Sequence, residues 1–392
     1  MTAIALTSHI LGALTVVSLF LWCGIGYRLW MMARSKSTIL EGKELPVPTD
    51  TSVSIVVPAH NEERVIDRCA TSLRNQSYTD IQIIFVLDRC TDNTFKILNK
   101  HASEDSRIQL VEIDDCPEDW AGKCNAARVG AKRATGDWVL FTDADTQFDV
   151  DLVQYAIASA INRKATLLSI LSSLTITKTF ERIVQPIAGT FLVRQFPVDR
   201  VNREERSRPF ANGQFLLFLR STYESIGTHQ AVKDDLLEDI AFARLVHANG
   251  GRVQVLFSHG MLRCSMYPTF KAFKTGWKRI YIEASTRNVK RLRRSAALAV
   301  VVSIILPAAS IAGIVVGQIE SPFLFWSSIA SLLACCIVVG WLYKINNAPM
   351  FYALFAPLGG LVVAKLFLDA ASMLKNRKPI HWCGREYILE PK

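Results

Sequence analysis

The chain has 392 residues, of which half are hydrophobic and one fifth are charged, and its mean hydropathy is positive. This balance excludes an ordinary soluble enzyme, so we expect part of the chain to lie in a membrane. The formal net charge of +10 comes without a nucleic-acid-binding motif or a basic repeat interleaved with aromatic residues, which excludes nucleic acid as a partner and favours anionic lipid headgroups.

An apolar segment at residues 8–32 is long enough to cross a hydrocarbon core of about 30 Å as a transmembrane helix. A signal peptide is the competing interpretation, but the segment is long, lacks a basic leader and has no small-residue cleavage site. The basic residues Arg34 and Lys36 follow it and predict that the next domain is cytoplasmic, in a bacterial inner membrane protein or an equivalent. Nine scattered cysteines also suit a reducing compartment. Residues 37–50 form a polar linker.

Residues 51–265 alternate between short apolar strands and helices. This order predicts an α/β domain with a mostly parallel sheet that is covered on both faces. Polar loops follow the strands, so we expect them to gather at one edge of the sheet. The first three strands are expected at residues 53–57, 81–87 and 108–113.

A fourth buried strand, from Trp138 to Thr142, ends in two carboxylates, Asp143 and Asp145. Open α/β folds bind their ligands at this edge of the sheet. Two carboxylates at this spacing can share one Mg²⁺ or Mn²⁺ ion with a diphosphate, because these ions prefer oxygen ligands. The alternative is a solvated Asp followed by a helix cap, and the neighbouring loops favour the metal site over it.

Those loops supply groups that a nucleotide diphosphate needs. Asn61 and Glu62 lie at a strand-to-helix junction, where backbone amides and short polar groups can hold a ribose or a base. Asp88 can accept a hydrogen bond from a pyrimidine N–H or a ribose hydroxyl, and Lys123, after a glycine at a helix start, can lie near phosphates. Each of these residues, taken alone, also fits a structural role: Asn61 as a helix cap, Asp88 as a turn former and Lys123 as a solvated side chain. Their common placement at one edge favours a nucleotide site.

The second half of the domain is harder to interpret. Residues 183–198 are apolar but contain Pro186 and Pro197, which argues against a straight spanning helix, and both a membrane-surface segment and a buried core segment fit. Asn212-Gly-Gln214 leads into a strand, and Gly213 allows close backbone approach to a sugar or an acceptor. An acidic cluster at residues 234–239 opens a helix; it either complements the positive end of that helix or holds a catalytic carboxylate.

Residues 266–294 are predicted to form an amphipathic helix in the membrane interface, because aromatic and basic residues alternate at helical spacing. Residues 295–374 form a C-terminal membrane region with two spans, at 296–317 and 323–343, and a third stretch at 350–374 that either spans or re-enters. If the third stretch spans, the basic tail of residues 375–392 lies outside, against the positive-inside tendency. A re-entrant or interfacial stretch returns the tail to the cytoplasm beside the active site.

An ordered set of motifs resembles glycosyltransferase family 2 over residues 53–281. The resemblance implies a GT-A fold, a nucleotide-sugar donor with UDP as the expected nucleotide, a divalent metal and inversion at the anomeric carbon. The motifs are Val57-Pro-Ala-His-Asn-Glu-Glu63, Val86-Leu-Asp88 with Thr91-Asp-Asn-Thr94, Gly122-Lys123, Gly136-Asp-Trp-Val-Leu-Phe-Thr-Asp-Ala-Asp145 and Leu237-Glu-Asp239.

The chain is similar to the membrane branch of that family that glycosylates lipids such as carotenoids, hopanoids and ceramides. The runs Phe210-Ala-Asn-Gly-Gln-Phe-Leu-Leu217 and Trp382-Cys-Gly-Arg385 carry this narrower resemblance. Polysaccharide-extending relatives carry Gln-x-x-Arg-Trp where this chain has Trp277-Lys-Arg279. The departure weighs against a processive synthase and puts a donor-phosphate role for Arg279 in doubt.

Roles for individual residues follow partly from the resemblance and partly from the chemistry of sugar transfer. Asp239 becomes the candidate general base, since the acceptor hydroxyl must lose its proton on the face of the sugar opposite the leaving group. Asp143 and Asp145 would bracket ribose, metal and diphosphate. The donor would contact Pro58, Ala59, Asn61, Glu62, Asp88, Lys123 and Asp143. The sugar and acceptor pocket would contain Asn212, Gly213, Gln214, Glu238, Trp277 and Arg279.

We therefore predict a metal-dependent, inverting glycosyltransferase that moves one sugar from a nucleotide donor to the hydroxyl or carboxyl group of a membrane lipid such as a polyprenoid, carotenoid, hopanoid or sphingolipid. One alternative is a processive polysaccharide synthase. The other is a membrane scaffold that binds nucleotide or lipid without turnover.

Overall fold

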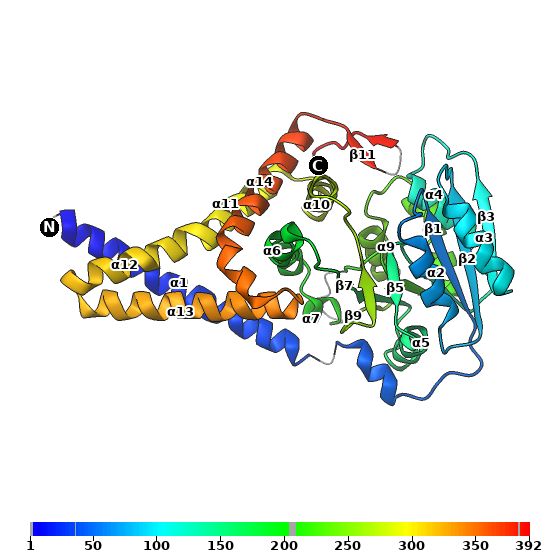
Figure 1. Ribbon diagram of the computed structural model, residues 1–392, viewed down its shortest axis with the longest axis horizontal. Helices are drawn as coiled ribbons and strands as arrows, with labels where there is room; N and C mark the ends of the chain where they lie inside the picture. The colour runs from blue at the N-terminus through cyan, green and yellow to red at the C-terminus, as the bar shows by residue number, and fades with distance from the viewer. Residues whose placement is uncertain (1–2, 36, 204–208, 383–384) are drawn as a thin grey trace.

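The computed structural model describes residues 3–35, 37–203, 209–382 and 385–392. It has two parts, a long bundle of three helices and a rounded α/β domain, with further helices packed between them (Figure 1). The bundle consists of α1 (Ala3–Ala33), α12 (Leu306–Glu320) and α13 (Pro322–Ile345). Because the α12–α13 turn and the N-terminus both lie at the far end, the bundle projects away from the α/β domain.

A seven-stranded sheet forms the centre of the α/β domain, in the order β3-β2-β1-β4-β8-β6-β9. β8 runs antiparallel to both of its neighbours, β4 and β6, while the other strand pairs described in this sheet are parallel. The predicted mostly parallel α/β sheet is therefore confirmed. The strands are β1 (Val53–Ala59), β2 (Ile81–Asp88), β3 (Ile108–Ile113), β4 (Trp138–Phe141), β6 (Leu167–Leu171), β8 (Leu216–Leu219) and β9 (Val253–Phe257).

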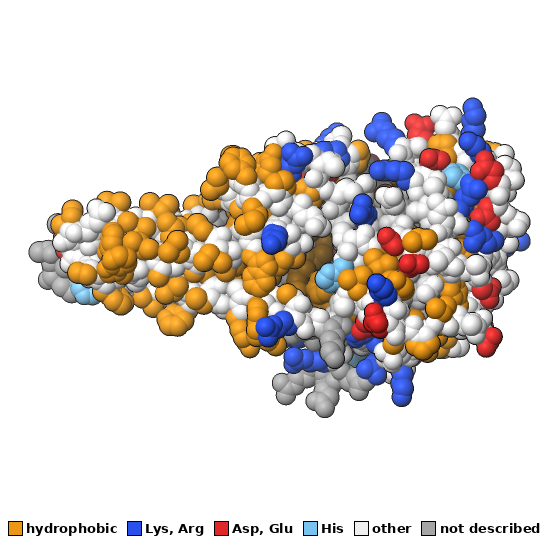
Figure 2. All heavy atoms as spheres, turned by 60° about the horizontal axis from the view of Figure 1, so that its bottom comes forward, with side chains coloured by type: hydrophobic (Ala, Val, Ile, Leu, Met, Phe, Trp, Pro, Cys, Tyr) orange, Lys and Arg blue, Asp and Glu red, His pale blue; other side chains and the backbone are white. Residues whose placement is uncertain are grey.

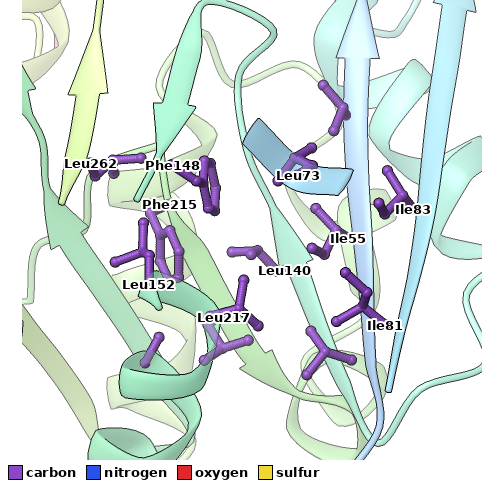
Figure 3. Close-up of a cluster of buried hydrophobic side chains, with 14 of the residues drawn as sticks. Ile55, Leu73, Ile81, Ile83, Leu140, Phe148, Leu152, Phe215, Leu217 and Leu262 are labelled. Atoms are coloured by element: carbon purple, nitrogen blue, oxygen red, sulfur yellow. The ribbon is translucent and has the colours of Figure 1, made fainter. Parts of the chain in front are cut away.

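Helices bury both faces of this sheet, because neighbouring residues of each strand point to opposite sides. Ile55 belongs to one apolar cluster, with Leu140 and Leu217 (Figure 3), and the next residue, Val56, belongs to the other. The first face is covered by α2 (Ile66–Arg74), α3 (Thr94–Glu104) and α5 (Leu152–Asn162), and the second by α4 (Gly122–Ala131), α8 (Arg220–Ser225) and α9 (Glu238–Ala248).

A second, three-stranded sheet lies next to the end of β4. It contains β5 (Thr146–Phe148), β10 (Leu262–Cys264) and β7 (Ser173–Leu174), with β10 in the centre. Since β5 begins directly after Asp145, this sheet fixes the chain that follows the Asp-x-Asp motif. It also brings Cys264 to that motif from far along the sequence.

The predicted helix at residues 266–294 is in fact two helices, α10 (Phe270–Ala284) and α11 (Val289–Val300). The chain turns between them, where Thr286 and Arg287 have φ angles of 57° and 54°. Phe273, Trp277 and Tyr281 are at most 3% exposed. These aromatic side chains pack in the core that α10 shares with α6 (Thr179–Gln195) and α14 (Ala356–Lys375), so they do not provide a membrane-facing surface.

Four helical segments in the described residues are long and apolar enough to cross a membrane, judged by length and composition: Thr7–Ala33, Val289–Glu320, Pro322–Ile345 and Met350–Lys375. The last contains α14, which differs from the others in its packing. It lies across the junction between bundle and domain (Figure 1) and packs against α6, α10 and α11. Residues 183–198, whose placement was left open by the sequence, fall largely in α6 and belong to this half-buried layer.

The C-terminal tail returns to the α/β domain. Its hairpin, β11 (Ile380–Trp382) and β12 (Arg385–Tyr387), follows α14. The backbone N–H of Gly122, at the start of α4, donates to the Tyr387 hydroxyl over 3.3 Å. The backbone N–H of Lys392 donates to the carbonyl of Arg287 over 3.1 Å. The tail therefore lies on the same side of the bundle as the α/β domain.

Gly136→Ala is expected to lower the free energy of unfolding by about 1–3 kcal/mol, the usual cost of overpacking. A methyl group at this position would lie 2.6 Å from the backbone nitrogen of Ser54 and 2.8 Å from the carbonyl carbon of Val53. Thermal unfolding in detergent measures the effect. Gly189→Ala in α6 is the control, since its nearest neighbour is 4.0 Å away; equal losses from both variants would contradict the steric explanation.

Candidate active site

The loops after β1 and β2 interlock at the carboxyl edge of the sheet. Asn61 has a φ of 57°, and its side-chain oxygen accepts the backbone N–H of Thr91 over 2.8 Å. The backbone N–H of Glu62 donates to the Thr94 hydroxyl over 2.8 Å. Asn61 thus ties the two loops together, which is the structural role that the sequence left open for it, and it shapes the edge through the backbone.

Three other residues predicted to bind the donor lie in the same place. Asp88 is the last residue of β2 and is 3% exposed. Its carboxylate accepts hydrogen bonds from Nε and Nη2 of Arg89, each over 2.8 Å. Pro58 and Ala59 end β1, and Ala59 is buried. The Asp88 carboxylate is therefore already neutralised by a neighbour, while Pro58 and Ala59 present backbone to the edge.

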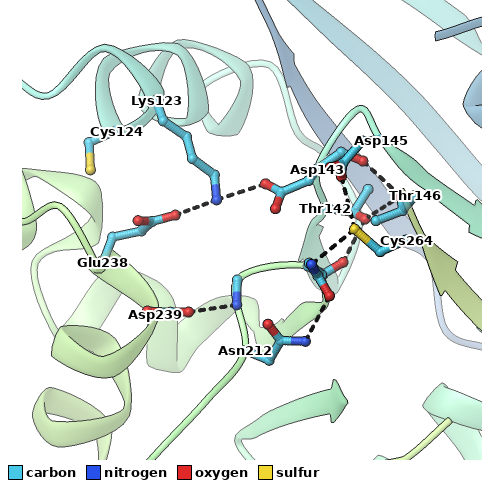
Figure 4. Close-up of polar contacts among 12 residues, drawn as sticks. Lys123, Cys124, Thr142, Asp143, Asp145, Thr146, Asn212, Glu238, Asp239 and Cys264 are labelled. Atoms are coloured by element: carbon cyan, nitrogen blue, oxygen red, sulfur yellow. Dashed lines mark hydrogen bonds and ion pairs between the residues drawn. The ribbon is translucent and has the colours of Figure 1, made fainter. Parts of the chain in front are cut away.

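Lys123, at the start of α4, joins two carboxylates that come from different parts of the fold. Its ammonium group lies 2.7 Å from Asp143 Oδ1 and 2.6 Å from Glu238 Oε1 (Figure 4). Burial alone would lower the pKa of Lys123, but the two carboxylates hold it well above its ordinary value. The same ammonium keeps the pKa of the buried Glu238 below its ordinary value. Lys123 is thus a charged lysine at the centre of the site.

Three carboxyl groups converge beside it. Burial, followed by the charges of Asp145 and Asp143, raises the pKa of Glu62 to about 8. Burial and the charge of Asp143 raise the pKa of Asp145 to about 6. Carboxylates that raise one another's pKa favour a nearby cation. The donor set of Asp143 and Asp145 fits a divalent metal in this respect, although no group of three or more potential metal ligands is found among the described residues.

Asp145 is held by groups that the sequence did not reveal. The Cys264 thiol donates to Asp145 Oδ1 over 3.3 Å and accepts Nε2 of Gln214 over 3.0 Å. The backbone N–H of Ser265 donates to the carbonyl of Asp145 over 3.1 Å. No local motif signals Cys264, because only the pairing of β10 with β5 brings it to the site.

Asp239 lies on the other side of Lys123, in the first turn of α9. Its carboxyl group accepts the backbone N–H of Gly213 over 2.8 Å and that of Ile240 over 2.7 Å. Burial and the neighbouring charge of Glu238 raise its pKa to about 7. A Cβ at Gly213 would lie 3.2 Å from Lys123 Nζ and 3.3 Å from Asp239 Oδ2. A glycine at this position therefore leaves the space between the lysine and the acid open.

The remaining residues predicted for the sugar and acceptor pocket make three different kinds of contact. Asn212 donates to the carbonyl of Ile170 over 3.1 Å and to Gln214 Oε1 over 3.2 Å, so these two side chains brace the loop. Arg279 donates to the carbonyl of Leu236 over 2.7 Å, next to the start of α9. Trp277 is 3% exposed and points into the α6–α10 layer behind the site.

A mostly parallel α/β sheet with a convergent acidic edge and a partly buried lysine is typical of α/β domains that bind a ligand at the carboxyl ends of their strands. The sequence profile of the family "Glycosyl transferase family 2" matches residues 54–227. Residues 54–227 therefore match the family that the sequence resemblance indicates, and the sheet has the GT-A fold that this resemblance implies.

Curated relatives match parts of the chain. The 4,4'-diaponeurosporenoate glycosyltransferase of Staphylococcus haemolyticus is 23% identical over 61% of this chain and 63% of its own length. The uncharacterized glycosyltransferase EpsJ of Bacillus subtilis is 36% identical over 24% of this chain and 26% of its own length. The alignment with glycosyltransferase GlyA of Streptococcus pneumoniae covers 14% of that protein, and the alignment with an uncharacterized glycosyltransferase of Haemophilus influenzae covers 36% of it. The chain thus spans only part of the length of these relatives.

Among solved structures, the mannosyltransferase PcManGT of Pyrobaculum calidifontis, in complex with GDP-Man and Mn²⁺, is similar with a TM-score of 0.49 and 17% identity. The alignment covers 93% of this chain and 98% of that chain.

Proposed function

We propose that the protein is a membrane-bound, inverting glycosyltransferase that moves one sugar from a nucleotide-sugar donor to a membrane lipid. The observation that supports it most is the placement of Lys123 and Asp143 on one side of Gly213 and Asp239 on the other. A leaving diphosphate needs positive charge on one side of the sugar, and the acceptor needs a base on the opposite side. The family match of residues 54–227 supports the same reaction class.

Each residue has a distinct task in this proposal. Asp239 takes the proton of the acceptor, and its raised pKa suits a base that works near neutral pH. Lys123 provides fixed positive charge for the departing diphosphate, and Glu238 holds the ammonium in place. Asp143 and Asp145 would hold Mg²⁺ or Mn²⁺, which neutralises charge that develops on the diphosphate. The backbone around Pro58, Ala59 and Asn61, with Asp88, would hold the nucleoside.

A lipid acceptor is supported by the surface of the helical part. Large apolar side chains are exposed along the bundle, and a hollow with apolar walls lies between the helical part and the α/β domain (Figure 2). The similarity to a carotenoid-acid glycosyltransferase supports the same class of acceptor. Exposed examples include Val17, Phe20, Ile311, Val315, Phe323, Trp326, Leu333 and Ile337.

We further propose that α14 lies at the membrane surface on the side of the α/β domain, while α1, α11–α12 and α13 cross. The contacts of Tyr387 with Gly122 and of Lys392 with Arg287 support this topology, because they tie the tail to the catalytic side. The basic residues of α11 would then face anionic headgroups on the cytoplasmic side.

A protease test of sealed vesicles checks this topology. In inside-out vesicles, a tag after Lys392 is expected to be cleaved as readily as a tag in an exposed loop of the α/β domain. In right-side-out spheroplasts, both tags should be protected. Opposite protection of the two tags would show that α14 spans.

Transfer of labelled sugar from a panel of UDP-sugars and GDP-sugars tests the function. Membranes containing the protein are supplied with host lipids and run with Mn²⁺ or Mg²⁺, or with chelator. We expect label in the organic phase, lost with chelator and restored by metal. Label only in a water-soluble polymer would favour a processive synthase, and failure of every donor would favour a scaffold without turnover.

A further inference from the structure

Among the buried polar atoms of the described chain that lack a hydrogen-bond partner, two on uncharged side chains lie between α6 and α10. Gln185, in α6, is 4% exposed, and its Nε2 atom has no acceptor, although its Oε1 atom accepts the indole N–H of Trp277 over 3.4 Å. The hydroxyl of Tyr267, between β10 and α10, is also buried without a partner. Buried donors are nearly always satisfied in folded proteins, so two orphans in one layer require an explanation.

Both groups face the same turn of α10. A Cβ built on Gly276 would collide with the Tyr267 hydroxyl, so the ring lies directly against this turn. The next residue, Trp277, contacts Gln185. Phe273, one turn earlier, packs edge-to-face on Tyr267 with ring centroids 5.5 Å apart. The two orphan groups thus belong to one small region with aromatic walls.

This region adjoins the candidate active site. Tyr267 lies two residues after Ser265, whose backbone N–H binds the carbonyl of Asp145. Tyr267 also follows β10, whose Cys264 thiol donates to Asp145 Oδ1 over 3.3 Å. Farther along α10, Arg279 binds the carbonyl of Leu236 before the helix that carries Asp239.

The region also adjoins the apolar helical layer. Gln185 lies on α6, which packs against α14, and the same buried cluster contains Phe191 of α6 and Phe367 of α14. The region thus has polar orphan atoms toward the candidate active site and apolar side chains toward the membrane helices, which is the polarity of a lipid with a polar end.

We propose that Gln185 Nε2 and the Tyr267 hydroxyl bind the oxygen-bearing polar end of the acceptor lipid. The amide donates to a ligand oxygen, and the phenol donates to or accepts from the same end. This inference rests on the proposed function and names two positioning residues for its acceptor.

Gln185→Met and Tyr267→Phe test the inference, because each keeps the volume and removes the orphan donor. Transfer from a fixed donor is measured into vesicles of host total lipid extract, with separate titrations of lipid and donor. We expect the lipid KM to rise by about threefold to tenfold in each variant. The donor KM should not change. The melting temperature of Tyr267→Phe should stay equal or rise, because this change removes only an unsatisfied buried group. Gln185→Met also removes the acceptor of the Trp277 indole N–H and should lower the melting temperature.

Tyr281→Phe is the matched control. Tyr281 is a buried tyrosine of α10 whose hydroxyl donates to the carbonyl of Ala188 over 3.2 Å. This variant should show the reverse of the Tyr267→Phe pattern, a lower melting temperature with an unchanged lipid KM. Wild-type transfer with an unchanged lipid KM in both Gln185→Met and Tyr267→Phe would overturn the inference and leave the proposed function standing. Absence of wild-type transfer would instead contradict the proposed function itself.

Discussion

Asp239→Asn is expected to reduce sugar transfer by about 10²–10⁴-fold, the usual contribution of a positioned general base. An asparagine keeps the shape of the side chain and one acceptor for the backbone N–H groups of Gly213 and Ile240, but it cannot take a proton. Donor binding, measured by calorimetry or by protection from thermal unfolding, should persist. Asp234→Asn, at an exposed carboxylate in the same segment, is the control and should transfer normally.

The pH dependence of wild-type transfer follows from the same group. The base works only when it is ionised, and the pKa of Asp239 is raised to about 7. The rate should therefore fall as the pH drops below about 7 and reach a plateau above it. An ionised Asp239 also lowers the free energy of unfolding progressively as the pH rises from 3.8 to about 7, because the folded state binds the proton more tightly.

Asp239→Asn should accordingly be no less stable than the wild type at pH above 7. Full transfer activity in this variant would remove Asp239 from the role of base. A loss of activity with a matching loss of folded protein would leave the role unsupported, and the comparison of melting temperatures separates these results.

Lys123→Met is expected to lower the free energy of unfolding by about 3–5 kcal/mol, because it leaves buried carboxylate charge without its partner. Glu238 is 4% exposed, and Lys123 is the cation that holds its pKa down. Transfer should also be lost, since Asp143 and Glu238 would no longer be bridged. Chemical denaturation and donor turnover measure the two effects.

Two matched variants make this prediction specific. Lys233→Met removes the partner of the exposed Asp119 and should cost at most about 1 kcal/mol. The double variant Lys123→Met, Glu238→Gln should recover part of the lost stability, because a neutral amide is cheaper to bury than an unpaired carboxylate. It should not recover transfer. Equal losses from Lys123→Met and Lys233→Met would contradict the buried network.

The sequence was sufficient to predict the sheet and the convergence of its loops. β-branched runs marked the strands, and parallel strands place their carboxyl ends at one edge, so Asp88 and Asp143 could be assigned to the same region before the structure was known. The structure also brings Lys123 into contact with Asp143. That contact depends on the position at which α4 begins. Gly122, directly before Lys123, indicated this position in the sequence.

Other features depend on long-range pairing that no local pattern encodes. The insertion of β8 between β4 and β6 places Gly213 beneath Lys123, and the second sheet carries Cys264 to Asp145. Residues 266–294 show the same limit. Their aromatic spacing fits a membrane-facing helix and a buried helix equally well, and the packing of α6 and α14 on α10 decides for burial of Phe273, Trp277 and Tyr281.

The mass of the lipid product tests the central claim most directly. Purified protein in vesicles of host lipid extract is incubated with the active nucleotide sugar and Mn²⁺, and the extracted lipids are compared by mass spectrometry with those from Asp239→Asn. We predict one lipid species that gains the mass of a single sugar residue in the wild type and not in the variant. A ladder of masses that lengthens with time, or an identical product from Asp239→Asn, would contradict the account.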